Sequence, residues 1–272
     1  MNAKLLAFDI GNTVVHLGVF DGDDLATTLR VSTDTRRSAD EYGAMMTNLL
    51  HLKGIDPGGI DAACMCSVVP PLTVVFNEVC DVFFGVKPLI VSAGVRTGLP
   101  ILYDNPRDVG ADRIADAVAA IRLYGPPLVV VDLGTATVFD AISREGEYLG
   151  GAIAPGMNLA ADALFFNTSQ LRRIELVAPR SAVGRSTITS MQSGLVLGYA
   201  GLVSTMVGRF KDEIGQDARV IGTGGLVNVI AQEAAVFDHI NQDLTLVGLR
   251  LIHKLNQGHQ PTGEGRDRTT SR

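Results

Sequence analysis

The chain has 272 residues, 46% of them hydrophobic, and a formal net charge of −6. This length favours two domains, and the apolar content is sufficient for a core in each. The acidic balance argues against a general nucleic-acid surface, and the apolar stretches are too short for a transmembrane helix or a signal peptide. Three cysteines, an odd number, fit reduced thiols in the cytoplasm better than a disulfide framework.

The first part of the chain has the pattern of three strands followed by alternating helices and strands. Residues 4–10, 13–21 and 25–32 are predicted strands. A capping box at residues 38–41 opens a helix that Gly54 ends. The elements predicted next are a buried strand at 61–68, a helix at 70–84 and a short strand at 88–91.

A turn-rich loop at residues 97–110 leads into the second part of the chain. Loops of this length inside compact domains are often functional. A helix is predicted from Gly110 to about Tyr124, and residues 128–132, 136–142 and 147–153 repeat the initial three-strand pattern. We therefore expect an N-terminal domain at residues 1–115 and a C-terminal domain at 116–257.

The C-terminal part contains a long predicted helix that residues 184–187 open and that runs to about Ile214. Within it, Gly194, Gly198 and Gly201 form a strip of small residues. Each costs a helix about 1 kcal/mol relative to alanine. This indicates close approach of another backbone, either within one subunit or from a second. A strand entering a glycine turn at 220–225 and a helix at 243–256 follow, and residues 258–272 are predicted to be a disordered tail.

Two Asp-x-Gly motifs, at residues 9–13 and 132–137, interrupt the predicted strands. In each, an apolar strand ends in an aspartate, a glycine turn and a threonine. Such a set suits a polyphosphate and its metal ion, although a single copy is more often an ordinary hairpin. Two copies half a chain apart predict a duplicated fold with a nucleotide between the halves.

Other phosphate-binding and catalytic motifs do not fit the sequence. No lysine follows a glycine-rich loop as a P-loop requires, and no G-x-G-x-x-G follows a strand. The sequence has no G-x-S-x-G nucleophile elbow, and its histidines lack zinc-site spacing. Cys64 and Cys66 alternate within a strand, which favours buried core residues over redox chemistry.

Seven motifs follow one another along the chain. They are Asp9-x-Gly11-Asn12-Thr13, Thr33-Asp34-x-x-Arg37-x-x-Asp40-Glu41-Tyr42, Tyr103-x-Asn105-Pro106, Gly110-Ala111-Asp112-Arg113, Asp132-x-Gly134-Thr135-Ala136-Thr137, Gly150-Gly151-x-Ile153-x-Pro155-Gly156 and Thr223-Gly224-Gly225. In their order and spacing they resemble type III pantothenate kinase, an enzyme of coenzyme A biosynthesis in the acetate and sugar kinase/Hsp70/actin superfamily. The resemblance covers about residues 4–257, and one departure is Val14, where many members have asparagine. The implied fold is α/β, with two similar ribonuclease H-like (actin-like ATPase) domains, mixed sheets and a nucleotide in the cleft between them.

The resemblance implies ATP-dependent phosphorylation of pantothenate to 4'-phosphopantothenate, with Mg²⁺, by a homodimer whose active site lies at the interface. The residues implied for ATP are Asp9, Ile10, Gly11, Asn12, Thr13, Val14, Val15, His16 and Thr135, with Gly222 to Gly225 near the adenine. Those implied for pantothenate are Tyr103, Gly110, Ala111, Asp112, Arg113 and Thr187. Asp112 would accept the proton, Thr187 would act across the interface, and Asp132 would hold a monovalent cation, K⁺ or NH₄⁺.

Two other functions on the same fold stay open, a non-catalytic regulatory protein and an actin/Hsp70-like ATPase. Retention of Asp9, Asp112, Asp132 and Thr187 argues for an enzyme, because a regulator could lose Asp112 without consequence. Actin/Hsp70-like ATPases are usually longer and lack the Gly-Ala-Asp-Arg helix start. Taken without the resemblance, Asp112 and Arg113 form an ordinary charge pair at a helix start.

Overall fold

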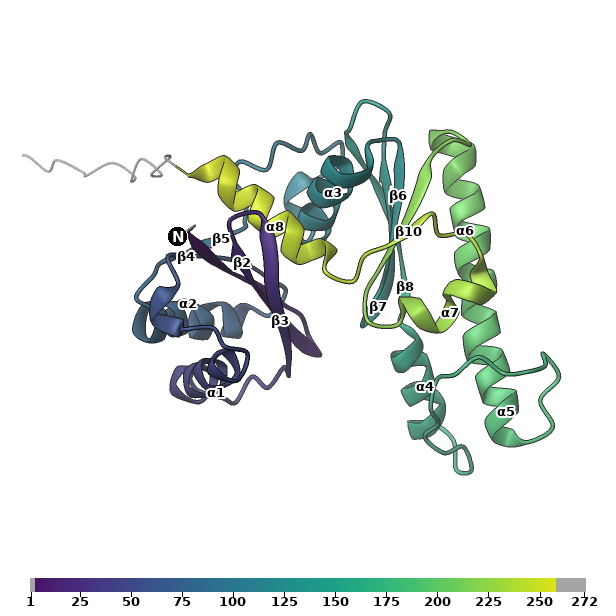
Figure 1. Ribbon diagram of the computed structural model, residues 1–272. Coiled ribbons are helices and arrows are strands. Elements are labelled where there is room, and N and C mark those ends of the chain that lie inside the picture. Colours follow the sequence, from purple (N-terminus) through teal and green to yellow (C-terminus); the bar gives the residue numbers. More distant parts are fainter. Residues whose placement is uncertain (1–2, 258–272) are drawn as a thin grey trace, which may run out of the picture.

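The structure, a computed structural model that describes residues 3–257, has two α/β halves, each built on a five-stranded mixed sheet (Figure 1). The strand order is β3-β2-β1-β4-β5 in the first sheet and β10-β9-β6-β7-β8 in the second. The predicted α/β class with two mixed sheets is confirmed. The predicted tail at 258–272 lies outside the described residues.

The first half follows the predicted order of elements closely. Its elements are β1 (Lys4–Ile10), β2 (Val14–Asp21), β3 (Asp24–Ser32), α1 (Ala39–Leu52), β4 (Ala62–Ser67), α2 (Pro70–Phe84) and β5 (Pro88–Ile90). The capping box between Ser38 and Glu41 forms at the start of α1. Phe8, Tyr42 and Phe76 are among the buried residues that pack α1 and α2 against this sheet.

The second half contains two elements that the sequence did not predict, α7 and β10. Its elements are α3 (Ala111–Tyr124), β6 (Leu128–Leu133), β7 (Ala136–Ile142), β8 (Tyr148–Pro155), α4 (Met157–Phe166), α5 (Thr187–Gln192), α6 (Gly198–Ile214), β9 (Arg219–Thr223), α7 (Val227–Ala234), β10 (His239–Ile240) and α8 (Leu244–Asn256). The predicted long helix is present, but a π-helical segment, Ser193–Leu197, separates α5 from α6.

The central strands of the two sheets have equivalent surroundings. β1 pairs antiparallel with β2 and parallel with β4, and β6 pairs antiparallel with β7 and parallel with β9. Asp9 and Asp132 therefore occupy corresponding places near the ends of corresponding strands. This repetition is what the two Asp-x-Gly motifs predicted.

Helices α3 and α8 lie side by side between the two sheets (Figure 1). α8 buries Leu246, Leu249 and Ile252 with residues of the first sheet. α3 buries Ala117 and Ala120 with residues of the second sheet and Ala115 with residues of the first. The two helices pack closely at Gly248 of α8 and Ala115 of α3. A Cβ on Gly248 would lie only 2.0 Å from the Ala115 carbonyl oxygen, so a larger residue would not fit there. The last helix thus returns to the first half. The predicted boundary at residue 115 falls inside α3 and stays a prediction.

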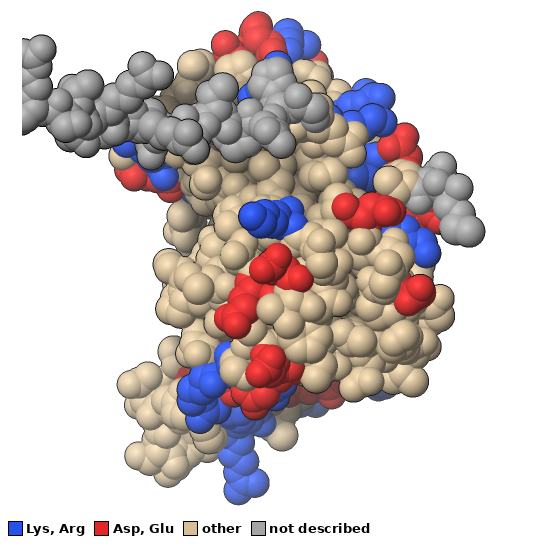
Figure 2. Space-filling view, turned by 90° about the vertical axis from the view of Figure 1, so that its left-hand side faces the viewer, with Lys and Arg blue, Asp and Glu red and all other residues tan. Residues whose placement is uncertain are grey.

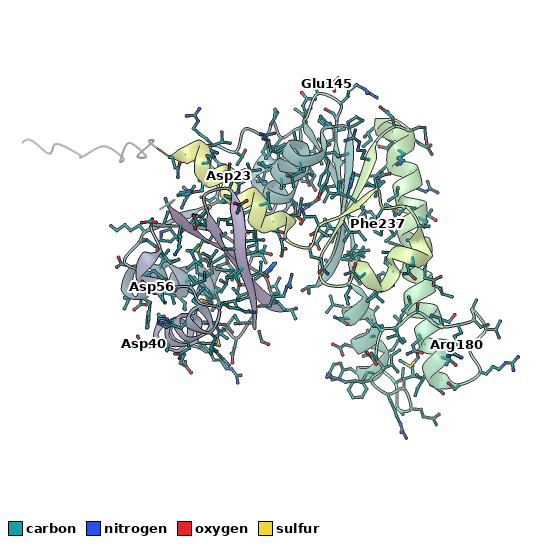
Figure 3. All side chains as sticks on the ribbon, viewed as in Figure 1. Asp23, Asp40, Asp56, Glu145, Arg180 and Phe237 are labelled. Atoms are coloured by element: carbon teal, nitrogen blue, oxygen red, sulfur yellow. The ribbon has the colours of Figure 1, made fainter. Side chains whose placement is uncertain are left out.

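Helices α4 and α5 extend beyond the second sheet, and Arg180 marks the loop that joins them (Figures 1 and 3). Figure 2 shows one face of the molecule, on which acidic and basic side chains lie in small mixed groups within a mainly uncharged surface. Cys64, Cys66 and Cys80 are buried and unpaired. Among residues 3–257, no helix has the combination of length and hydropathy that crossing a bilayer requires.

Candidate active site

The two Asp-x-Gly turns meet in the structure. The Thr13 hydroxyl lies 2.9 Å from the Thr135 hydroxyl, although 122 positions separate them in sequence. The first turn is closed by the Gly11 N–H, which donates to the Val14 carbonyl oxygen at 3.1 Å. The Thr33 hydroxyl donates to the Gly11 carbonyl oxygen at 2.7 Å. A segment from each half therefore forms one wall of a shared site.

The residues predicted to bind the nucleotide divide into an exposed group and a buried group. Asn12, Thr13, Val14 and Thr135 are exposed, and Gly11 is half-buried. By contrast, the side chains of Ile10, Val15 and His16 are buried in the first half. The exposed group can contact a ligand directly, whereas the buried group can only support the turn.

His16 is buried beside the start of α8. Its Nε2 lies 3.4 Å from Asp243 Oδ1 and makes no hydrogen bond within the described residues. Burial, and then the positive charge of Arg30, lower the pKa of His16 to about 4. The imidazole is therefore neutral near pH 7 and contributes packing, not charge, behind the first turn.

Four aspartates converge beside these turns: Asp9, Asp112, Asp116 and Asp132. Burial, and then repulsion from Asp112, raise the pKa of Asp9 to about 7. The hydrogen bond that the Cys66 thiol donates to Asp9 acts in the opposite direction and lowers this pKa. Burial and then repulsion from Asp9 and Asp112 raise the pKa of Asp132 to about 7. This mutual repulsion means that a cation placed among the carboxylates would be strongly favoured.

Asp116 follows Asp112 by one helical turn on α3 and is only 4% exposed. Its carboxylate accepts a hydrogen bond of 2.7 Å from the Thr245 hydroxyl of α8. Burial, and then repulsion from Asp132, still hold the pKa of Asp116 well above its ordinary value. The sequence reasoning missed Asp116, although its spacing of four from Asp112 was a usable signal.

Among the described residues, no three or more His, Cys, Asp or Glu side chains are arranged to hold a metal ion by themselves. Mg²⁺ usually binds one or two carboxylates together with substrate phosphates and water. Asp9, near the end of β1 and next to the exposed turn at residues 11–14, fits such a partial site. The donor set therefore suits a metal ion that arrives with a nucleotide.

Glycines create the space around these carboxylates. A Cβ on Gly224, at a φ of +86°, would lie 2.3 Å from Asp132 Oδ1. A Cβ on Gly110 would lie 2.4 Å from Asp112 Oδ1. Asp112 stands in the first turn of α3, half-buried, where it also accepts the Arg113 N–H at 2.8 Å. The glycine turn at 222–225 therefore lies beside Asp132, and Gly110 allows the Asp112 carboxylate to fold over the helix start.

Arg113 is held by a buried partner that the sequence reasoning missed. Its Nε and Nη2 donate to Asp140 Oδ1 at 2.9 and 2.6 Å, and the Tyr148 hydroxyl donates to the same oxygen at 2.7 Å. Burial raises the pKa of Asp140, and Arg113 and Tyr148 act in the opposite direction. The signal for Asp140 was present, because a charged residue at an inward position of a predicted strand requires a partner.

Tyr103, from the loop before α3, lies in the same neighbourhood. Its ring centroid is 6.3 Å from that of Tyr148, and a Cβ on Gly150 would lie 3.3 Å from its Cε2 atom. Tyr103 and Arg113 thus both lie near the Tyr148 ring, and Asp112 directly precedes Arg113 on α3. This group borders the carboxylates on the α3 side.

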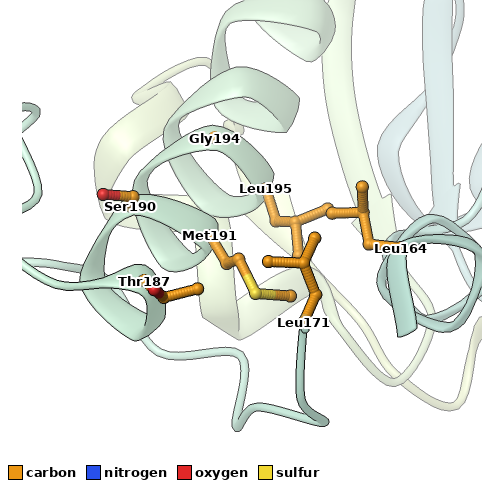
Figure 4. A pocket seen from close by; sticks show the side chains of 7 residues that line it. All are labelled: Leu164, Leu171, Thr187, Ser190, Met191, Gly194 and Leu195. Atoms are coloured by element: carbon orange, nitrogen blue, oxygen red, sulfur yellow. The ribbon is translucent and has the colours of Figure 1, made fainter. Parts of the chain in front are cut away.

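Thr187 lies elsewhere, at the start of α5 in the extension formed by α4 and α5 (Figure 1). It lines a cavity of about 550 Å³ (Figure 4). The other residues of this lining are Leu164, Leu171, Ser190, Met191, Gly194 and Leu195. Among the predicted substrate residues, Thr187 therefore stands apart from the group at the start of α3.

The family model and the curated relatives agree on one family. The sequence model of type III pantothenate kinase matches residues 5–209. A type III pantothenate kinase of Dehalococcoides mccartyi is 48% identical over 254 residues, which are 93% of this chain and 97% of that protein. The chain belongs to the type III pantothenate kinase family. The family resemblance of the motifs is confirmed.

A second curated relative belongs to the same family, and one solved structure shares the fold. The type III pantothenate kinase of Myxococcus xanthus is 48% identical over 252 residues, 93% of this chain and 98% of that protein. The solved activator of 2-hydroxyisocaproyl-CoA dehydratase from Clostridium difficile, with bound ADPNP, has a TM-score of 0.52 at 12% identity. It covers 96% of this chain and 100% of its own, and at that identity it shows the fold alone.

Proposed function

We propose that this member of the type III pantothenate kinase family transfers the terminal phosphoryl group of ATP to pantothenate, forming 4'-phosphopantothenate in the cytoplasm. The reaction is the first step of coenzyme A biosynthesis. The observation that carries the proposal is the meeting of Thr13 and Thr135, which brings an Asp-x-Gly turn from each half to the carboxylates at the start of α3. The family membership supports it over nearly the whole chain.

The site residues fit a reaction that depends mainly on positioning and on charge stabilisation. The exposed turn at residues 11–14 offers backbone and hydroxyl groups to the phosphates, and Asp9 would hold the divalent ion that neutralises their charge. Asp112 accepts the proton of the substrate hydroxyl. Its carboxylate stands half-buried in the first turn of α3, beside the two Asp-x-Gly turns.

The test of this function is ATP turnover with and without pantothenate, read as formation of phosphorylated pantothenate. We expect ADP and the product in equal amounts, and only with pantothenate present. Equal ATP turnover without pantothenate would favour the actin/Hsp70-like ATPase. No turnover in either condition would favour the regulatory protein.

We also propose that Asp132 holds a monovalent cation. Its half-buried carboxylate lies against Gly134 and Gly224, which leave room beside it, and carboxylate oxygens suit hard cations. Asp132→Ala is expected to raise the K⁺ concentration for half-maximal activity by about tenfold or more, because a ligand is lost. Activity is titrated against K⁺, with Asp217→Ala, an exposed aspartate, as the control. An unchanged K⁺ curve for Asp132→Ala would place the cation elsewhere.

A homodimer is the third part of the proposal. A Cβ placed on Gly194, Gly198 or Gly201 would meet no described atom within 4 Å beyond its own helix and neighbours. Of the two alternatives that the sequence left open, this favours a second subunit as the close neighbour. Phe166 and Ile188 are exposed apolar side chains on the extension formed by α4 and α5, which also favours this extension as the contact surface between subunits. Thr187 would then complete the partner's pantothenate site.

A mixing experiment tests the shared site. If Thr187 serves the partner subunit, a mixed dimer of Asp112→Asn and Thr187→Val chains has one site with both changes and one with neither. Random exchange should therefore restore activity toward about a quarter of the wild-type value. Each variant mixed with itself is the control, and mass spectrometry establishes exchange. If exchange occurs without recovery, Thr187 acts in its own subunit.

A further inference from the structure

A second cavity of about 550 Å³ opens farther along the helix pair α3/α8, away from the carboxylates. Arg122 follows Asp112 along α3 by about 15 Å of helical rise. The cavity is lined by Arg122 and Leu123 of α3, by Arg250, Lys254 and Leu255 of α8, and by Asp23 of the turn between β2 and β3. Figure 3 shows Asp23 next to α8.

The charge of this cavity is positive, although the chain as a whole is acidic. Among its described residues, the lining contains one carboxylate, that of Asp23. Two cations share it: Arg250 donates a hydrogen bond to Asp23 Oδ1, and the Lys254 Nζ lies 3.3 Å from the same oxygen. Within the described residues, the guanidinium of Arg122 makes no hydrogen bond or ion pair. The Arg250 Nε is buried and also lacks a hydrogen-bond partner there. The cavity can therefore accept an anion.

The rest of the wall is aliphatic and exposed to solvent. Leu123 and Leu255 are 48% and 50% exposed, so a ligand could cover both. The volume is in the range of small-molecule sites. Arginine presents a planar fork that matches phosphate oxygens. A ligand that satisfies both parts of the lining has an aliphatic body and a phosphate group.

The cavity also spans the two halves of the molecule. α3 buries Ala117 and Ala120 in the core of the second sheet and also contacts β4 of the first. Most buried residues of α8, and the turn at Asp23, belong to the first sheet. Between the cavity and the cleft, the helices are tied by the Thr245–Asp116 hydrogen bond of 2.7 Å and by the contact of Gly248 with Ala115. A ligand that touches both helices must therefore bind some relative positions of the halves better than others.

We propose that this cavity binds an aliphatic organic phosphate and that its occupancy is coupled to nucleotide affinity in the cleft. The binding stands on the lining alone. The coupling rests on the proposed function, because it is read as a change in the KM for ATP. Coupling between two binding sites is reciprocal. If the ligand in this cavity raises or lowers the affinity for the nucleotide, the nucleotide changes the affinity for that ligand by the same factor.

The binding experiment is calorimetric titration of hexyl phosphate, hexan-1-ol and inorganic phosphate into the full-length protein, with Mg²⁺ and a non-hydrolysable ATP analogue occupying the nucleotide site. We expect hexyl phosphate to bind at least about tenfold more tightly than either fragment. Arg122→Gln, an exposed position, should weaken that binding about tenfold through loss of a charged hydrogen bond. Lys87→Gln, at an exposed position just before the edge strand β5, is the matched control and should bind normally.

Several outcomes would overturn the proposal. Hexyl phosphate that binds no better than inorganic phosphate would mean that the aliphatic wall is not used, and unchanged affinity in Arg122→Gln would place the binding elsewhere. The second readout is the KM for ATP, expected to change at least about threefold with hexyl phosphate in the wild type but not in Arg122→Gln. Binding without this change would remove the coupling. Binding in a protein without kinase activity would contradict the proposed function and leave the site intact.

Discussion

Asp112→Asn is expected to lower kcat by about a hundredfold or more while leaving the fold intact. The carboxylate stands in the first turn of α3, half-buried. Burial is the main cause of the raised pKa values of Asp9 and Asp132, and the charge of Asp112 raises both further. The Asp112 carboxylate therefore lies within electrostatic reach of both halves of the cleft. Asparagine has nearly the same shape but cannot accept the proton of the substrate hydroxyl.

Steady-state kinetics with varied pantothenate separate the possible roles of Asp112. A proton acceptor affects kcat, whereas a residue that only binds substrate would raise KM and leave kcat unchanged. Asp217→Asn removes the same charge from an exposed position and should behave as wild type. A thermal unfolding midpoint within the error of the wild type excludes misfolding. Normal kcat in Asp112→Asn would exclude the assigned role.

The sequence was sufficient to predict the two Asp-x-Gly turns because each lies at the end of an uninterrupted apolar strand. Such a strand has a local signature, and the repeated order of elements predicted that the two turns would correspond. The contact between Thr13 and Thr135 agrees with that expectation. The exposure of Asn12 and the burial of His16 were not predictable, because they depend on how α8 and β3 pack around β2.

Long-range packing accounts for the features that the sequence did not predict. Helix α8 has an amphipathic pattern, but this pattern does not specify that its partner is the first sheet. β10 spans two residues, too few for a periodic signal, and the eight-residue α7 was likewise not predicted. The pairing of Arg113 with Asp140 joins residues 27 positions apart on a helix and a strand. Local spacing carries no information about such a pair.

Asp140→Asn is expected to lower the free energy of unfolding by about 3 kcal/mol or more, the usual result of removing one partner of a buried ion pair. The Asp140 and Arg113 side chains are 3% and 11% exposed, and Asp140 Oδ1 receives three donors, two from Arg113 and one from Tyr148. The amide removes the negative charge and leaves the Arg113 guanidinium buried without a counterion. The cost follows from that unpaired cation.

The matched control is Asp217→Asn, which breaks an exposed pair with Arg144 at a similar distance, 2.8 Å against 2.6 Å. The side chains of this pair are 59% and 60% exposed, so water screens the pair and the expected loss is much smaller than for Asp140→Asn. Urea unfolding of both variants at one protein concentration measures the difference, since a dimer makes stability depend on concentration. Equal losses would mean that burial adds nothing to the Asp140 pair.

The same variant also tests whether Asp140 positions Arg113 for the substrate. Arg113 lies beside Asp112 and over the Tyr148 ring, at 5.7 Å from its centroid. Without Asp140 the guanidinium can leave this position, and the KM for pantothenate should rise about tenfold, while the KM for ATP changes little. A purely structural role would reduce the amount of folded enzyme and leave both KM values unchanged. An increase confined to pantothenate therefore assigns Arg113 and Asp140 to the pantothenate side of the cleft.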